Sequence, residues 1–159
     1  MIGVLDQATI EFFHGGCALL VGTVDDTGMP HAGRGHGLTV LTADPLRVRL
    51  LVDADDIRSA ANLQPDARVA ICTGDVLTLR SLQLKGRVVS VEPATPDDEA
   101  KHRQYAHDFA NDINRTDGDL LEMLQRWTER PVTACVVDVD EMFDQTPGPS
   151  AGRRIEEGP

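Results

Sequence analysis

The stretches ALLVGTV at residues 18–24, DDTG at 25–28 and HAGRGHGLTVL at 31–41 decide the fold class of this chain. Similar strand-like runs with intervening turn sequences follow: LRVRLLV at 46–52, ARVAICT at 67–73 and LTLRSLQLKGRVVSVE at 77–92. In the first turn, an aspartate at the first position and a glycine at the last are typical of a type I turn. Several short strands separated by turn signals predict a small antiparallel β-barrel or sandwich.

Helices are expected on both sides of this run of strands. The segments with helix start or stop signals are 6–14, 55–64, 95–109 and 120–127. The third begins with Thr95 as a capping residue and a proline at the first helical position. For the second, Asp53 or Asp55 is the expected cap. A polar break is expected at 112–119, and a final β-rich run at 133–139.

Length and charge set limits on the class of protein. A chain of 159 residues predicts one domain, which we expect at 1–143, followed by a Pro/Gly-rich tail at 144–159. The net charge of −11, with 15 Lys and Arg against 26 Asp and Glu, argues against a nucleic-acid partner. No stretch approaches the roughly 20 apolar residues of a membrane span, and the N-terminus lacks the basic region of a signal peptide. A cytoplasmic location without a membrane partner is therefore the expectation.

The cysteines and histidines do not form a metal-binding pattern. Cys17, Cys72 and Cys135 are widely spaced and include no CxxC pair, which favours buried, reduced thiols. His102 and His107 are five residues apart, whereas metal-binding pairs on a helix are three or four apart. No metal site is expected.

The segment Gly33-Arg34-Gly35-His36-Gly37 is the first candidate binding element. Glycine inside a strand often marks a bulge or a ligand that lies close to the backbone. If the side chains alternate, the three glycines share one face and Arg34 and His36 share the other. Two interpretations remain open. The glycine face leaves room for a flat ring, or the glycines only relieve crowding along a twisted strand.

Three further segments are weaker candidates. Arg58 and Ser59 lie at the start of the second predicted helix, where an arginine and free backbone N–H groups can hold a phosphate. Composition alone favours the alternative, a solvated surface arginine. Ser81 lies in a strand with polar residues on one face, which line a pocket or meet water. For Arg153 and Arg154 of the tail, two interpretations are open: the pair folds back over an anionic ligand, or it stays disordered.

Four pieces of the chain resemble one family. The pieces ALLVGTVDDTGMPHAGRG, LRVRLLVD, DIRSAANLQPDARVAI and LRSLQLKGRVVSV are similar to the FMN-binding split-barrel core of the pyridoxamine 5'-phosphate oxidase family, over about residues 18–92. The resemblance implies a six-stranded or similar antiparallel split β-barrel with flanking helices. It also implies a homodimer with FMN in two clefts at the subunit interface, and an FMN-dependent oxidoreductase that acts on a small molecule.

The resemblance also implies which residues contact the cofactor. These come from the strand after the first hairpin, the end of the next strand, the start of the following helix and one later strand: Arg34, Gly35, His36, Val52, Asp53, Arg58, Ser59 and Ser81. His36 is the nearest candidate for an acid–base catalyst. Ser59 stands where the family has a second basic residue, and the C-terminal substrate-binding pattern of the true oxidase is not recognisable. Arg130 lies outside the matched segment and is not expected at the site.

Two other functions stay open. One is a non-enzymatic split barrel that binds flavin, or haem through His31 or His36, for storage or sensing. The other is a reductase of the same fold that uses a deazaflavin cofactor.

Overall fold

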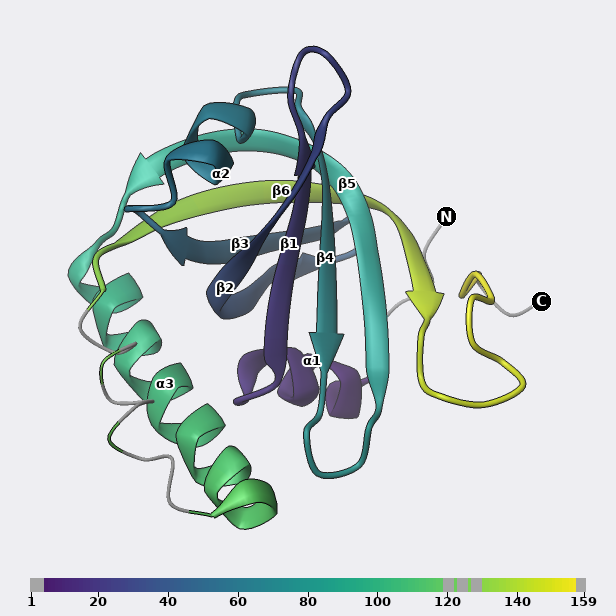
Figure 1. The fold of residues 1–159 in the computed structure, drawn as a ribbon. Coiled ribbons are helices and arrows are strands. Elements are labelled where there is room, and N and C mark those ends of the chain that lie inside the picture. The colour runs from purple at the N-terminus through teal and green to yellow at the C-terminus, as the bar shows by residue number, and fades with distance from the viewer. Residues whose placement is uncertain (1–4, 119–121, 123–125, 127–129, 157–159) are drawn as a thin grey trace.

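A closed antiparallel barrel forms the centre of the molecule (Figure 1). The computed structural model describes residues 5–118, 122, 126 and 130–156 of the chain. The six strands are β1 (Ala18–Val24), β2 (Pro30–Ala43), β3 (Leu46–Asp53), β4 (Arg68–Gly74), β5 (Ser81–Pro93) and β6 (Val132–Asp144). Around the barrel their order is β1-β2-β3-β6-β5-β4, and β4 pairs with β1 to close it. The predicted antiparallel barrel is thus confirmed.

The last two strands differ from their predicted ranges. The strand predicted at 77–92 begins at Ser81, because Leu79 has a φ of 63° and belongs to the preceding turn. The run predicted at 133–139 extends to Asp144. This long strand pairs with β3 on one side and along β5 on the other, from Pro93↔Thr133 to Leu82↔Asp144. The extension beyond Asp138 pairs with β5 alone, and this pairing carries the strand past its apolar pattern.

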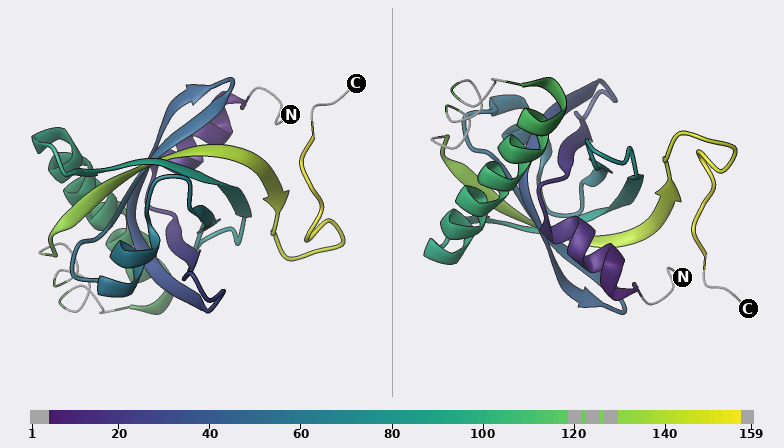
Figure 2. Two further views of the ribbon diagram at one scale, coloured as in Figure 1. Left: turned by 90° about the horizontal axis from the view of Figure 1, so that it is seen from above. Right: turned by 90° about the horizontal axis from the view of Figure 1, so that it is seen from below.

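The helices α1 (Gln7–His14), α2 (Ile57–Asn62) and α3 (Pro96–Asp117) flank the barrel. Figure 2 shows α1 across one end of the barrel and α3 along one side. Within the described residues, no helix combines the length and the apolar composition that crossing a bilayer requires.

The helix boundaries correct the sequence-based ranges. The second helix is shorter than 55–64, because Asp56, not Asp53 or Asp55, caps it. The third continues through the predicted polar break as far as Asp117, since Ile113 extends the apolar face of Phe109 by one turn and packs against the core. The predicted helix at 120–127 falls mostly outside the described residues.

Aliphatic side chains from all strands fill the barrel. Leu19, Leu50, Ile71 and Leu84 are fully buried, and Phe13 of α1 joins the same cluster. A core this closely packed leaves the outside of the barrel as the place for a ligand.

An ion pair joins α3 to the barrel. Arg49 of β3 donates from Nε to Oδ1 of Asp98 at 2.8 Å and from Nη2 to Oδ2 at 2.7 Å. The Thr95 backbone N–H donates to the same carboxylate at 2.8 Å, which completes a capping box at the start of α3. The hydrogen bonds from Arg49 are the main reason that the pKa of Asp98 is lowered to about 2.

Replacing Asp98 by alanine should lower the free energy of unfolding by about 2 kcal/mol, because Arg49 then keeps a partly buried charge with only Glu92 left as a partner among the described residues. The folded-state pKa lies below the unfolded value, so the contribution is present above about pH 4 and lost as the pH falls towards about 2. Urea unfolding across this range checks both points. The exposed neighbour Asp97→Ala should change stability by less than about 0.5 kcal/mol. An equal effect of the two variants would contradict the assignment.

Candidate functional site

A cavity of about 350 Å³ lies where β2, the end of β3 and the start of α2 meet. This volume is within the usual range for small-molecule sites, at its lower end. Its lining residues come from these three elements and from the segment before β6: Ala32, Gly33, Arg34, His36, Asp53, Asp55, Asp56 and Arg130.

Arg34 and His36 of β2 share the face that borders the cavity, as the alternation predicts. The guanidinium of Arg34 lies over the ring of Phe109 of α3, 5.7 Å from its centroid. His36 is 6% exposed and packs edge-to-face against His102, with 5.2 Å between ring centroids. Burial, with a smaller contribution from His102, lowers the pKa of His36 to about 4. At neutral pH, His36 is therefore an uncharged hydrogen-bonding group and not a proton donor with a matched pKa.

The glycine face of β2 is filled by protein. A Cβ on Gly33 would lie 2.5 Å from the Ser59 hydroxyl oxygen, and one on Gly35 would lie 2.7 Å from Cβ of Leu19. The interpretation that this face leaves room for a flat ring is wrong, because α2 and the core occupy the space. Gly33 and Gly35 therefore relieve crowding, and the side chains of Arg34 and His36 border the cavity.

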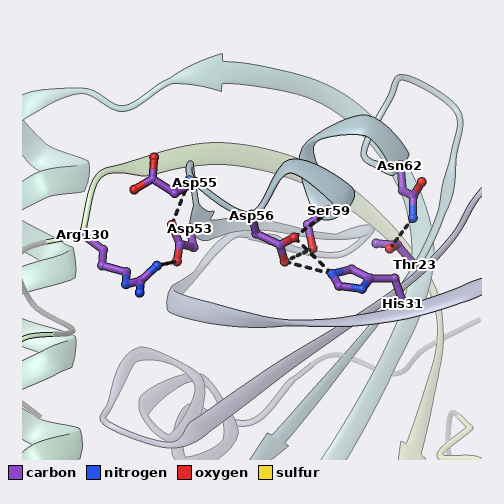
Figure 3. Close-up of polar contacts among 8 residues, drawn as sticks. All are labelled: Thr23, His31, Asp53, Asp55, Asp56, Ser59, Asn62 and Arg130. Atoms are coloured by element: carbon purple, nitrogen blue, oxygen red, sulfur yellow. Dashed lines mark hydrogen bonds and ion pairs between the residues drawn. The ribbon is translucent and has the colours of Figure 1, made fainter. Parts of the chain in front are cut away.

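Asp56 occupies the start of α2, where the sequence predicted a phosphate (Figure 3). Its carboxylate accepts the Ser59 backbone N–H at 3.1 Å and the Ser59 hydroxyl at 2.6 Å. Nε2 of His31 lies 3.1 Å from both carboxylate oxygens. Burial opposes ionisation, but these hydrogen bonds outweigh it and lower the pKa of Asp56 to about 2. An ionised carboxylate therefore holds the Ser59 hydroxyl and backbone N–H, two of the groups that were predicted to bind the phosphate together with Arg58.

Arg130 closes the other side of the cavity. Its Nη1 donates to Oδ2 of Asp53 at 2.9 Å, while Oδ1 of Asp53 accepts the Asp55 backbone N–H at 2.9 Å (Figure 3). The expectation that Arg130 lies away from the site is wrong. The pairing of Asp53 with Val132 across β3 and β6 brings it there, and no local sequence signal marks it.

Arg34, His36 and Asp53 are the predicted site residues that line this cavity. Gly35 and Val52 pair across β2 and β3, but Val52 is 3% exposed and its side chain packs in the core. These two residues support the site from behind and do not line it.

The other three predicted residues do not line the cavity. Arg58 is exposed on α2, and Ser59 is 2% exposed behind Asp56. Ser81 begins β5 and lines a different cavity of about 450 Å³, together with Cys72 and Gln83. Within one chain, Ser81 therefore lies away from the other seven residues that were predicted to contact the cofactor.

The tail lies at another part of the barrel (Figure 2). Arg154 forms a β-bridge with Phe143 and an ion pair of 3.3 Å with Glu141. The Ile155 backbone N–H donates to the Met142 carbonyl at 2.7 Å. The tail folds back on the end of β6 and not over the cavity of Arg34.

No protein-family model and no curated protein matches the sequence, whereas solved structures match the fold. HupZ from Group A Streptococcus has a TM-score of 0.55 at 16% identity, over 93% of this chain and 99% of that chain. A candidate pyridoxamine 5'-phosphate oxidase from Lactobacillus delbrueckii has a TM-score of 0.52 at 16% identity, over 87% of this chain and 93% of that chain. An FMN-binding protein from Syntrophomonas wolfei has a TM-score of 0.51 at 9% identity, over 87% of this chain and 86% of that chain. The chain therefore has the split-barrel fold of the pyridoxamine 5'-phosphate oxidase-like proteins.

Proposed function

We propose that this chain binds FMN in the cavity of Arg34, His36 and Asp53 and acts as a homodimeric, FMN-dependent oxidoreductase. One observation carries the proposal. A cavity of about 350 Å³ is lined by Arg34, His36 and Asp53, three of the eight residues that the family resemblance assigns to the cofactor. The shared fold with an FMN-binding protein adds support, although at 9% identity it bears on the fold alone.

The chemistry of the lining residues fits the ring and the sugar chain of a flavin. Arg34 and Arg130 offer N–H donors, which suit the carbonyl oxygens of the ring. Asp53 and Asp55 offer acceptors, which suit the ring imide and the ribityl hydroxyls. The phosphate has fewer available partners than the ring, because the hydroxyl and the backbone N–H of Ser59 already donate to Asp56. Arg58, which is exposed on α2, is the cation that we assign to the phosphate.

A bound flavin would supply the electron transfer, while the protein binds and orients it. Arg34 is held in place over Phe109, so its guanidinium can fix the orientation of the ring. His36 is uncharged at neutral pH and can hydrogen-bond without adding charge. The Asp53–Arg130 ion pair closes the far side of the cavity.

The haem alternative has less support from the geometry. Nε2 of His31 is engaged by Asp56, and His36 is 6% exposed beneath His102. The ring of His31 is therefore not free as an axial ligand, and little of the His36 ring is accessible. A deazaflavin would use the same cavity as FMN, and the visible absorption of the purified protein distinguishes it from a flavin.

Arg58→Ala should weaken FMN binding by about tenfold or more, because one charge-assisted hydrogen bond to the phosphate is lost. Riboflavin, which lacks the phosphate, should bind both proteins equally. The measurement is a titration of each flavin into apoprotein, followed by flavin fluorescence. Arg115→Ala, an exposed arginine near the end of α3, is the matched control. Equal FMN affinities would remove Arg58 from the phosphate site, and no flavin binding to the native protein would overturn the proposed function.

An apolar strip on the outside of the barrel supports the dimer. Leu20 and Val24 of β1 are 51% and 47% exposed. An adjoining groove of about 650 Å³ is lined in part by Val24, Ala32 and Ala70. Contiguous apolar surface of this kind marks an interaction site, and we propose that a second copy of the chain covers it.

Leu20→Glu combined with Val24→Glu should convert the dimer to a monomer of about 17.3 kDa, because charges buried between two copies are costly. Light scattering gives the mass directly. Leu41→Glu, at a similarly exposed position of β2 that does not line the groove, should leave the dimer intact. A monomeric native protein would contradict the dimer, and so would a double variant that remains dimeric.

A further inference from the structure

A second, larger cavity of about 730 Å³ shares Arg130 with the first. It lies between the end of β5, the first turns of α3 and the start of β6. Its walls combine charged with apolar residues: Val91, Glu92, Pro93, Ala94, Glu99, His102, Arg103, Arg130, Pro131, Val132 and Thr133. The volume is ample for a small molecule.

His102 carries a buried ring nitrogen that has no hydrogen-bond partner in the described part of the chain. The side chain is 4% exposed, and its Nδ1 lies 3.3 Å from the backbone carbonyl oxygen of His36. A carbonyl oxygen only accepts, so Nδ1 must carry the proton of the neutral ring. Nε2 is then an acceptor, and it is buried without a hydrogen bond among the described residues. Buried polar atoms are rarely left in this state, so a ligand that donates a hydrogen bond would complete the site.

The charged residues of the cavity are balanced in sign. Glu99 and Arg103 are four residues apart on α3, with His102 between them, so the three lie on neighbouring positions of one helix face. Arg130 comes from the opposite wall; a guanidinium has five N–H donors, and its ion pair with Asp53 leaves some of them for a ligand. Glu92 is already paired with Arg49. A ligand with both a positive and a negative group would satisfy this arrangement.

We infer that the larger cavity binds a small zwitterion of the α-amino acid class. The ammonium group donates to Nε2 of His102 beside Glu99, and the carboxylate accepts from Arg103 and Arg130. The apolar part of the wall, which includes Val91 and Val132, takes an apolar side chain. The inference rests on this cavity alone and does not require flavin to bind.

The test uses three probes of similar shape on the apoprotein. L-Leucine carries both charged groups, 4-methylpentanoate lacks the ammonium group, and 3-methylbutylamine lacks the carboxylate. Calorimetry should give L-leucine an affinity at least about tenfold higher than either partial probe, since each of those loses a charge-assisted contact. With ring-labelled histidine, nitrogen NMR should show the Nε2 resonance of His102 shifting with L-leucine; His102→Gln identifies that resonance by its loss.

Arg103→Gln should weaken L-leucine by about tenfold and leave 3-methylbutylamine unchanged, because only the carboxylate contacts this arginine. Arg115→Gln, three turns further along α3, is the matched control and should bind like the native protein. Failure of L-leucine to bind, equal affinities for the three probes, or unchanged binding by Arg103→Gln would each overturn the inference. FMN is titrated into the same proteins in parallel. Because the two ligands are measured separately, a failure of L-leucine binding can be distinguished from a failure of FMN binding.

Discussion

The pairing of β4 with β1 is the constraint on which the rest of the structure depends. It runs from Ala18↔Gly74 to Gly22↔Ala70 and turns the six strands into a closed barrel. Closure leaves no free sheet edge, and it also fixes which face of each strand is inside. Because aliphatic side chains fill the interior, both cavities that carry polar chemistry lie outside it, against α2 and α3. The register of β2 then decides that Arg34 and His36 border the smaller cavity.

The electrostatics at α2 follow from a single cap. Asp53, Asp55 and Asp56 stand within four positions, and each could cap a short helix by its residue type. Asp56 takes the role because it also reaches His31 of β2, a contact that only the folded barrel creates. A phosphate dianion would meet this carboxylate, and like charges at close range oppose binding. In the proposed function, the phosphate would therefore be held by arginine side chains and not by the helix backbone.

Local sequence signals predicted the barrel well, because alternation and turn residues act over a few positions. The range 18–24 predicted for the first strand matches β1, and Thr95 is the cap of α3 as expected. The site was less predictable, because its residues meet through register. Arg130 bonds to Asp53 across 77 positions of sequence, and Ser81 is carried to another cavity by its place opposite Gly74. Neither contact can be predicted from a local sequence pattern, because each depends on how distant strands pair.

Arg130 couples the two cavities physically. Its guanidinium holds Asp53 in the smaller cavity and borders the larger one, while the packed rings of His36 and His102 stand between them. A planar guanidinium can serve both sides, because its donors point in several directions. A substitution of Arg130 would therefore disturb both cavities at once and could not separate their roles. Residues that border one cavity alone, Arg34 for the first and Arg103 for the second, give the cleaner comparison.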